Sequence, residues 1–587
     1  MNAVVTDSSV VLELDYDKEA PVSLVKLDDV DGLAHYLFSY RSDEPGIPEP
    51  VTVKWKIPAR RVKGVWRNTV DFNKRIQADW EEEDQRSRIS IDSPVIGMFD
   101  HLDQNVLTFA CSNAINLIML GAKYREEDDC YYCHLSFFSE CKYPITNFET
   151  QIRIDLRTKQ LSRVLGDVSQ WWEDFDMRPM PVPEVARKPL YSTWYQFHQR
   201  LDPTTLVTEC KLAKELGYEA IIIDDGWQTK DNNRGYDFTG DWQPERLSDM
   251  SGLVRDIQRV GIKVGLWFSV PFCGVKSQAY QKFKGKFLTE NHRWAPVFDP
   301  RYPEVREHLV NIYRHAVDEW GLDGLKLDFI DDFQAYPETQ FGDDPARDHQ
   351  SINDAVNTLL TEVREAVTAI RPDIFIEFRQ RYVGPAIRKF GNILRAFDCP
   401  GDATMNRVRI ADIRQLAGNT VVHSDMITWN FQCSVEDASL HMLSTLFGVP
   451  QLSVLLEDIP GDQLEMIRFY TRYWRYRSDV LLNGEFIAMR PLSNYPMLQS
   501  TLDQVSIIGL YEDLVVPLGQ KFKEIDVLNA KMTNQIVLDT FQDIGHFEYT
   551  ILDCMGITVS SGLTEIKRGC NSWQVPVGGM VTFTEAP

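Results

Sequence analysis

Eight short apolar segments within residues 186–484 constrain the fold of this chain more than any other feature. They are LYSTW near 190, EAIIIDD near 219, KVGLWFS near 263, GLKLDF near 324, IFIEFRQ near 374, NILRAFD near 392, TVVHSDM near 420 and QLSVLLE near 451. In the intervening segments, such as AVNTLLTEVREAVTAI, apolar residues recur at intervals of three and four, which predicts amphipathic helices. Apolar strands alternating with helices are typical of parallel βαβ units. Eight such units predict an α/β fold, a closed (β/α)8 TIM barrel.

The segments on either side of this repeat show a different pattern. Before residue 185, runs such as VVLELDYD, VLTFACS and YCHLSFFSE alternate apolar and polar residues, which predicts an antiparallel β-sandwich. The proline-rich stretch MRPMPVPEVARKP is typical of an extended linker. Alternation returns after 485 in SIIGLYED, QIVLDTF and FEYTILD. We therefore expect an N-terminal β-sandwich with linker (1–185), a barrel (186–484) and a small C-terminal antiparallel β-sandwich domain (485–587).

Charge and cysteine usage exclude some classes of partner. The formal net charge of -24 disfavours nucleic acid, whose phosphates attract clustered Lys and Arg. The opening MNAVVTDSSVVLELDYD lacks a signal-peptide pattern, and no later apolar run is long enough to span a bilayer. Ten scattered cysteines fit a reducing compartment without structural disulfides, and Cys130 and Cys133 have no second pair with which to hold zinc. These features predict a cytoplasmic protein with neither a nucleic-acid nor a membrane partner.

Polar residues gather where the eight predicted strands end, which is where barrels of this type carry their active sites. They are Asp224 and Asp225, Asp328, Glu377 with Arg379, Arg395 with Asp398, and His423 with Asp425. Any one of them could simply meet solvent at the end of its strand. Converging carboxylates, however, raise one another's pKa values unless a cation or a function compensates. Divalent metal binding and glycoside cleavage by a carboxylate pair both use such a cluster.

Four tryptophans distinguish between these two functions. Trp194, Trp227, Trp242 and Trp267 lie at or just beyond predicted strand ends. Each could pack in the core, but four at one rim favour stacking on the apolar face of a sugar. The sequence therefore predicts a carbohydrate-active site.

The order of the motifs resembles that of glycoside hydrolase family 36, the α-galactosidases, in the clan that includes family 27. The resemblance rests on IIIDDGWQ, GDWQPE, GIKVGLWF, FDPRYPEVREHL, GLDGLKLDF and RAFDCPGD, and it covers the whole barrel. It implies retaining exo-hydrolysis of a terminal α-linked galactose, or a closely related sugar, from an oligosaccharide or glycoside. The chemistry requires no metal or organic cofactor. Members of the family are often oligomers, which leaves a homo-oligomer open.

The resemblance also implies roles for individual residues. Asp328 in KLDF matches the family nucleophile, and Lys326 matches a lysine that binds sugar hydroxyls. Asp224 and Asp225 match the pair that holds the 4- and 6-hydroxyls of galactose. Trp194, Trp227 and Trp267 are expected to line the same pocket.

Arg395 matches a sugar-binding arginine, and Asp398 matches the general acid/base. Asp402 is the alternative acid/base, because it follows four residues later in DCPGD. Asp398 is preferred because it lies directly at the strand end, whereas Asp402 follows Pro400 and Gly401 in a predicted loop. In that case Asp402 would orient a neighbour or bind a second sugar.

The expected mechanism uses two carboxyl groups about 5 to 5.5 Å apart. Asp328 attacks the anomeric carbon while Asp398 protonates the leaving oxygen, and Asp398 then activates water. Lys326 and Arg395 are expected to keep Asp328 ionised. Neighbouring negative charge is expected to hold Asp398 protonated near neutral pH.

The strand-five segment IEFRQRYVGP departs from the family, which often has a Cys-Ser-Gly-Gly-Gly type motif that recognises the 2-hydroxyl. Glu377 and Arg379 become candidate substrate ligands, and Arg379 with Arg381 could receive an anionic substituent. Equally, Arg379 could only neutralise the carboxylates, which is the favoured interpretation. Tyr195 also stands where many relatives have an acidic residue. An α-N-acetylgalactosaminide, a β-L-arabinopyranoside or an anionic galactoside analogue is therefore an alternative substrate.

Three other functions stay open from the sequence. An α-galactosyl transglycosylase similar to raffinose synthase would use the same residues. A Schiff-base lyase could use Lys326, although nearby Asp328 favours a charged lysine. A non-catalytic carbohydrate-binding protein would be expected to lack one carboxylate of the catalytic pair, and both are present.

Overall fold

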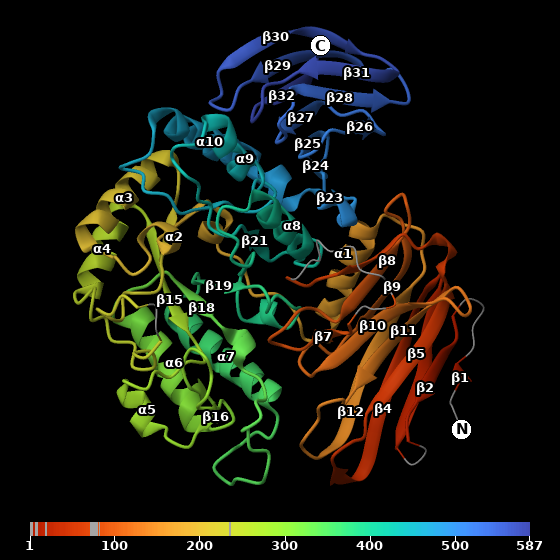
Figure 1. The fold of residues 1–587 in the computed structure, drawn as a ribbon, viewed down its shortest axis with the longest axis vertical. Coiled ribbons are helices and arrows are strands. Elements are labelled where there is room, and N and C mark those ends of the chain that lie inside the picture. The colour runs from red at the N-terminus through yellow and green to blue at the C-terminus, as the bar shows by residue number, and fades with distance from the viewer. Residues whose placement is uncertain are drawn as a thin grey trace.

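The chain folds into a central barrel with β-sheet structures on two sides, as Figure 1 shows. The computed structural model describes residues 4–5, 10–17, 20–70, 80, 83–233 and 236–586. In Figure 1 the N-terminal strands (red to orange) flank the barrel (yellow to teal), and the C-terminal strands (blue) lie beyond α9 and α10. No helix among the described residues combines the length and apolar character that crossing a membrane requires.

The N-terminal part is a sandwich of two six-stranded sheets, ordered β1-β2-β5-β11-β10-β7 and β3-β4-β12-β9-β8-β6. Its strands are β1 (Val4–Val5), β2 (Leu12–Asp15), β3 (Val22–Val30), β4 (Leu33–Gly46), β5 (Val51–Pro58), β6 (Gly64–Arg67), β7 (Gln85–Ser87), β8 (Val95–Phe99), β9 (Asn105–Cys111), β10 (Ile118–Arg125), β11 (Cys130–Phe137) and β12 (Ile145–Asp155). Alternate residues of β5 are buried, as the sequence pattern predicted. Phe38, Trp55 and Phe109 are among the side chains that fill the space between the sheets.

The prediction that residues up to 185 are all β is wrong at α1 (Leu161–Trp172). Its buried residues Leu161, Val164, Leu165 and Val168 recur at helical spacing, and the helix packs against β8 and β9. This helical spacing is present in the sequence, but it occurs next to segments that alternate like strands, and the prediction assigned the whole region to strands. The segment therefore joins the sandwich to the barrel through a helix before the linker begins.

The barrel confirms the predicted fold class. Its parallel strands are β13 (Leu190–Ser192), β14 (Ala220–Ile223), β15 (Lys263–Ser269), β18 (Gly324–Asp328), β19 (Phe375–Arg379), β20 (Ile393–Arg395), β21 (Val421–His423) and β22 (Gln451–Leu452). They are ordered β21-β20-β19-β18-β15-β14-β13-β22. Parallel bridges from His423 to Val449 and from Ile427 to Leu452 close the ring.

Helices surround the barrel strands (Figure 1). They are α2 (Trp194–Phe197), α3 (Pro203–Leu216), α4 (Met250–Val260), α5 (Gln278–Lys282), α6 (Pro303–Asp318), α7 (Ile352–Ile370), α8 (Ala403–Arg414), α9 (Val435–Leu443) and α10 (Gly461–Asn483), and β16 (Phe287–Thr289) pairs with β17 (Val297–Phe298). Short 3-10 helices are η1 (Ala59–Arg61), η2 (Glu173–Phe175), η3 (Glu184–Arg187), η4 (Ile330–Asp332), η5 (Ile387–Lys389) and η6 (Pro491–Ser493). Local signals set the ends of α3, where Asp202 accepts from Thr204 and Thr205 and Gly217 adopts a φ of 99°.

The C-terminal part has a seven-stranded sheet, β23-β24-β25-β27-β32-β29-β30, and a three-stranded sheet, β26-β28-β31. Its strands are β23 (Glu485–Met489), β24 (Met497–Leu502), β25 (Val505–Leu510), β26 (Val515–Leu518), β27 (Glu524–Asn529), β28 (Gln535–Thr540), β29 (Gly545–Leu552), β30 (Thr558–Ile566), β31 (Gly569–Gln574) and β32 (Met580–Glu585). The expected purely antiparallel pairing is wrong for β25 with β27 and for β26 with β28, which run parallel. The chain alternates between the two sheets here, so same-sheet neighbours are joined by a crossover rather than a hairpin.

Candidate active site

The carboxyl ends of the barrel strands bring most of the predicted site residues together. Backbone register places Asp328 opposite Ser269, Lys326 opposite Glu377, and Arg379 opposite Arg395. Parallel strands present these ends at one mouth of the barrel. The sequence prediction that charged groups from several strands meet is therefore confirmed by the geometry.

Asp328 accepts hydrogen bonds from four different residues. Its Oδ1 accepts from Arg379 Nε at 2.6 Å, from the Phe329 amide at 2.7 Å and from the Tyr382 hydroxyl at 3.2 Å. Its Oδ2 accepts from Trp267 Nε1 at 2.9 Å. These donors come from β15, β18 and β19 and the turns that follow, so the carboxylate is held from several sides.

The protonation of Asp328 follows from these partners. Burial raises its pKa, but the positive charges of Arg379 and Lys326 more than offset that effect and hold the pKa well below its usual range. The carboxyl group is therefore ionised across the working pH range of ordinary enzymes. The expectation that Lys326 helps to ionise it is supported, and Arg379 is the cation nearest to it.

Two carboxylates follow β14. Asp224 pairs with Lys326, whose Nζ lies 2.6 Å from Oδ2. Asp225 accepts from Gln228 at 2.7 Å and from Gln199 at 3.1 Å. Burial, together with the neighbouring charge of Asp224, raises the pKa of Asp225 to about 6. Asp224 and Lys326 thus form a charged pair beside the nucleophile candidate.

Arg395 binds three carboxylates at the end of β20. Its guanidinium donates to Asp425 at 2.5 Å, to Asp398 at 2.9 Å and to Glu377 at 3.2 Å. Glu377 is buried and also accepts from Gln451 at 2.5 Å. Its carboxylate is turned inward to orient Arg395, and its contact with substrate stays a prediction.

Asp398 is the carboxylate of this group that meets solvent, with 45% of its side chain exposed. Desolvation raises its pKa, but the Arg395 guanidinium outweighs that effect and holds the pKa below its usual range. The expectation that negative neighbours keep Asp398 protonated is therefore wrong for the unliganded protein. Burial instead raises the pKa of Asp425 to about 6, against the opposing charge of Arg395.

Asp402 and Asp398 have different surroundings. Asp402 is the N-cap of α8, where its Oδ1 accepts from the Met405 amide at 2.8 Å. Asp398 lies on Arg395, among the charges that include Lys326, Arg379 and Asp328. Asp398 therefore lies among the charges around Asp328 and Asp402 caps α8, and the assignment of the acid/base to Asp398 stays a prediction.

The four tryptophans predicted to lie at the rim differ in burial. Trp227, Trp242 and Trp267 are 0%, 2% and 2% exposed. Trp227 stacks on Trp242 at 5.7 Å and donates to the Trp267 carbonyl at 2.9 Å. Trp227 and Trp242 therefore pack in a buried layer, whereas Trp267 also donates to Asp328, and the sugar-binding role of Trp227 and Trp267 stays a prediction. Trp194, which is partly exposed beside His198, is the member of the set that keeps an accessible ring.

Some neighbours of the site were missed in the sequence. Tyr382, which the sequence did not single out, donates to Asp328 at 3.2 Å. Tyr236 lies among Asp225, Asp328 and Asp224, which together with burial raise its pKa well above the usual range. Asp332, four residues after Asp328, has a pKa raised to about 7 by burial and by Asp331. The position of Tyr382 just after strand five was the available signal; Tyr236 lies in a long loop that gave none.

Similarity searches connect this barrel with known proteins. The Melibiase family model matches residues 167–377, less than half of the chain. The α-galactosidase AgaA of Geobacillus stearothermophilus is 28% identical over 98 residues, which is 16% of this chain and 13% of the relative. An Escherichia coli α-galactosidase is 23% identical over 156 residues, which is 25% of this chain and 22% of the relative. These alignments span less than a quarter of either relative.

Solved structures match over nearly the whole chain. An α-galactosidase from Lactobacillus brevis has a TM-score of 0.63 at 14% identity, covering 100% of this chain and 83% of that one. A variant of AgaA from Geobacillus stearothermophilus in complex with raffinose has a TM-score of 0.65 at 14% identity. The match covers 98% of this chain and 83% of that one. At this identity the similarity establishes the shared fold.

Proposed function

We propose that the chain is a retaining glycoside hydrolase that releases terminal α-linked galactose, or a closely related sugar, from oligosaccharides by double displacement. The observation that carries the proposal is Asp328, an ionised carboxylate at the end of β18 that four residues hold in place. The Melibiase match and the α-galactosidase relatives support the same chemistry. Raffinose and stachyose complexes of the structurally similar enzyme AgaA support an oligosaccharide substrate.

In the first step Asp328 attacks the anomeric carbon. Its Oδ1 has three donors, whereas Oδ2 has the single donor Trp267 Nε1 and keeps a lone pair free. We assign Oδ2 as the attacking atom for this reason. Arg379, Tyr382 and Trp267 fix the carboxylate so that little reorganisation is needed during attack.

Asp398 is the general acid in this step and the general base in the next. Its exposure allows it to exchange protons with water and to reach a leaving group that enters from solvent. Because Asp398 and Asp425 share Arg395, their titrations are coupled and belong to the pair. The pair retains one proton below about pH 6, the pKa to which burial raises Asp425.

Sugar recognition falls to the residues after β14 and to Lys326. Asp224 and Lys326 form a pair that can both accept from and donate to adjacent hydroxyls. Arg379 is committed to Asp328 and to the Gln380 carbonyl at 2.6 Å, so it neutralises the nucleophile and does not receive an anionic substituent. This favours a neutral sugar over an anionic analogue.

The Schiff-base alternative is disfavoured by Lys326. Burial lowers its pKa, but the Asp224 carboxylate outweighs that effect, and the net pKa is raised. The amine therefore stays protonated, while Schiff-base formation requires the neutral amine. Borohydride trapping with a carbonyl substrate is expected to label nothing.

A screen of nitrophenyl glycosides tests the proposal. The panel comprises α-galactoside, α-N-acetylgalactosaminide, β-L-arabinopyranoside and charged derivatives, with NMR of the first-formed anomer. We expect fastest turnover of the α-galactoside and an α-galactose first product. A β first product would contradict the retaining mechanism, and adding sucrose as acceptor would reveal transglycosylation.

A further inference from the structure

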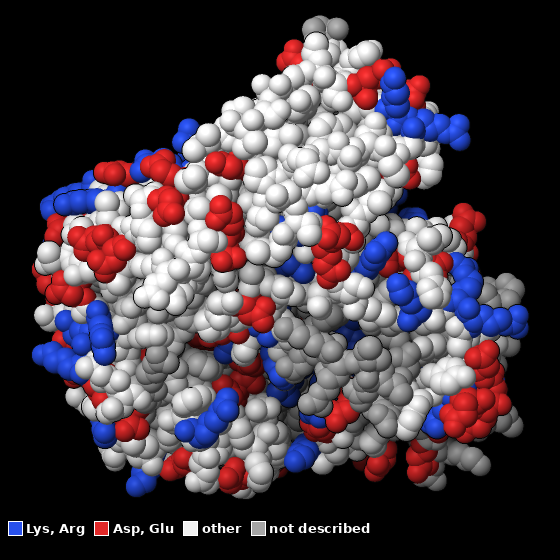
Figure 2. Space-filling view, turned by 45° about the horizontal axis from the view of Figure 1, so that its top comes forward, with Lys and Arg blue, Asp and Glu red and all other residues white. Residues whose placement is uncertain are grey.

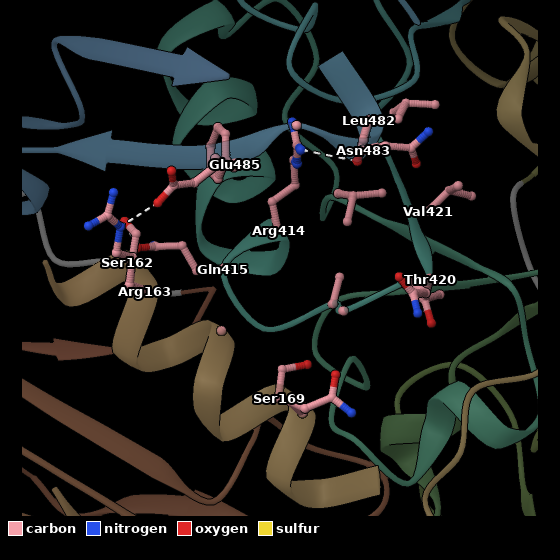
Figure 3. Close-up of a pocket in the computed structure, with 18 of the residues that line it drawn as sticks. Ser162, Arg163, Ser169, Arg414, Gln415, Thr420, Val421, Leu482, Asn483 and Glu485 are labelled. Atoms are coloured by element: carbon pink, nitrogen blue, oxygen red, sulfur yellow. Dashed lines mark hydrogen bonds and ion pairs between the residues drawn. The ribbon is translucent and has the colours of Figure 1, made fainter. Parts of the chain in front are cut away.

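A cavity lies at the end of the barrel opposite the strand ends that carry the site. Figure 3 shows the residues that line it. It has a volume of about 350 Å³ and lies between α1, the end of α8, the chain that enters β21 and the chain between α10 and β23. Thr420 and Val421 stand at the start of β21, whereas Asp425 follows its far end. The cavity is therefore separated from the mouth of the barrel by the length of the strand.

Two arginines next to this cavity lack an ion-pair partner among the residues that the structure describes. Arg414 donates to the Phe447 carbonyl at 2.7 Å and lies 4.2 Å from the centre of the Phe486 ring. Arg388 donates to Ser169 at 2.8 Å. Burial lowers the pKa of Arg414 to about 9 and that of Arg388 to about 10.

Gly418 brings Arg388 close to the cavity wall. Gly418 lines the cavity, and a Cβ placed on it would lie 2.8 Å from Nη1 of Arg388. A side chain at residue 418 would collide with this guanidinium, so glycine is required for Arg388 to lie this close to the cavity wall. Glycine is also suited to the φ of 56° observed there.

The acidic residues of the lining do not cancel these charges. Glu485 is already paired with Arg163, as Figure 3 shows. Glu173 is the remaining carboxylate of the wall, and its charge acts on Arg388 without forming an ion pair with it. Arg187 adds a further cation and contacts Asn483 at 3.3 Å. The lining and the layer behind it therefore have an excess of positive charge.

Thr420 provides an unused hydrogen-bonding group in the same wall. It is 3% exposed, and its Oγ1 has no hydrogen-bond partner among the described residues. Buried hydroxyls are normally hydrogen-bonded, so this hydroxyl in the cavity wall can bond to a polar ligand. Figure 3 shows Thr420 across the cavity from Arg163 and Glu485.

We propose that this cavity binds the phosphate group of a small molecule, with Arg414 and Thr420 as ligands. Guanidinium groups recognise phosphate oxygens through charge-assisted hydrogen bonds, and a dianion would neutralise the uncompensated charge of Arg414 and Arg388. The space exceeds that of free phosphate, so a phosphate monoester with a sugar-sized body also fits. Free phosphate and a phosphate monoester are the two sources that the test distinguishes.

Isothermal titration calorimetry on the full chain tests the proposal at constant ionic strength. The probes are inorganic phosphate, glucose 6-phosphate and, as the uncharged control, glucose. We expect a saturable one-site isotherm with at least one phosphate and none with glucose. Tighter binding of glucose 6-phosphate identifies a monoester site, and equal or tighter binding of inorganic phosphate identifies a free-phosphate site. Absence of binding by both phosphates overturns the proposal.

Variants locate the binding site. Arg414→Gln and Thr420→Val are each expected to weaken phosphate binding at least tenfold, whereas Arg259→Gln, which changes an exposed arginine on α4, is expected to leave it unchanged. Thr420→Val keeps the shape of the side chain and removes no hydrogen bond, so it serves if Arg414→Gln fails to fold. Wild-type affinity in Thr420→Val and in any folded Arg414→Gln overturns the assignment. Because the readout is binding, it is independent of whether the barrel mouth hydrolyses glycosides.

Discussion

The ionised state of Asp328 arises from contacts between strands that are adjacent only in the folded barrel. Arg379, the residue that departs from the family pattern, is 2.6 Å from its Oδ1. The same arginine lies 5.0 Å from the Phe397 ring and 5.1 Å from the Phe329 ring. A guanidinium held between aromatic faces cannot readily swing toward a ligand. The arginine that marks the change in strand five therefore stabilises the ionised form of Asp328.

Replacing Asp328 tests its role directly. Asp328→Asn is expected to lose more than about a thousandfold in kcat, because the amide cannot form the glycosyl intermediate, while circular dichroism stays native. Azide added to Asp328→Gly is expected to yield β-galactosyl azide, identified by NMR. Wild-type turnover in the Asn variant would show that another residue is the nucleophile.

The dependence of activity on the leaving group of the substrate distinguishes Asp398 from Asp402 as the acid/base. Asp398→Ala is expected to retain activity mainly on nitrophenyl substrates, since a good leaving group needs no proton. Asp402→Ala is expected to keep the wild-type preference and to lose about 0.5 to 2 kcal/mol of stability, because it removes the cap of α8. If the leaving-group pattern follows Asp402 instead, the acid/base assignment is wrong.

The pH profile reports the pair that shares Arg395. Below about pH 6 the pair holds one proton, and above it both carboxylates are ionised, so kcat/KM is expected to fall as pH rises through 6. In Asp425→Asn only Asp398 titrates, and because Arg395 lowers its pKa, the fall should move to lower pH. If the pH profile of Asp425→Asn is identical to that of the wild type, the titration of Asp425 is not coupled to that of the general acid.

At the scale of elements, the strand ends and the loops after them contribute differently to the site. Trp267 of β15 donates to the Asp328 carboxylate of β18, so these neighbouring strands jointly hold that carboxylate in place. The tryptophans in the long loop after β14 complete a buried aromatic layer beneath it. Trp227 and Trp242 of this loop therefore support β15 from within the buried layer.

Two tryptophan variants distinguish the buried layer from the rim. Trp227→Ala is expected to cost about 3 to 5 kcal/mol of stability, measured by denaturant unfolding, because it opens a cavity under β15. Trp194→Ala is expected to raise KM with little effect on stability, since its ring is partly exposed at the rim. If Trp227→Ala loses sugar affinity without losing stability, Trp227 stacks on the sugar and is not a support for the core.

At the scale of the whole molecule, one buried cluster joins all three parts of the chain. Trp66 of β6 donates to the Tyr495 hydroxyl at 2.8 Å and to Asp412 of α8 at 3.2 Å, and Tyr495 itself donates to Asp412. All three side chains are buried. Their burial raises the pKa of Asp412 to about 7, so this junction is most stable with Asp412 protonated.

Stability is expected to depend on pH through this cluster. The pKa of Asp412 is higher in the folded protein than in the unfolded chain. The contribution of Asp412 to the free energy of unfolding is therefore fully present below about pH 4 and is lost as pH rises toward 7. Asp412→Asn should remove that dependence, measured as the difference in unfolding free energy between variant and wild type across pH 4 to 7. A constant difference across this range would show that Asp412 does not titrate on unfolding.

The sequence by itself determined the barrel and placed Asp328, the proposed nucleophile, at the end of a barrel strand. Strand and helix periodicity are local properties of consecutive residues, and a residue that ends an apolar strand must lie at the mouth of a parallel barrel. The alternation of the flanking segments likewise predicted both sandwiches. The expectation of purely antiparallel C-terminal pairing was wrong, because strand alternation does not reveal which sheet each strand joins.

Only the tertiary structure decided how the side chains at the mouth are used. Spacing placed Glu377, Asp398 and Trp267 at the site, but partners from other strands turned Glu377 inward, ionised Asp398 and directed Trp267 at Asp328. Burial and charge pairing depend on residues distant in the chain, so no local pattern encodes them. The cavity at Arg414 is a further case, since α1, α8 and β21 meet there only after folding.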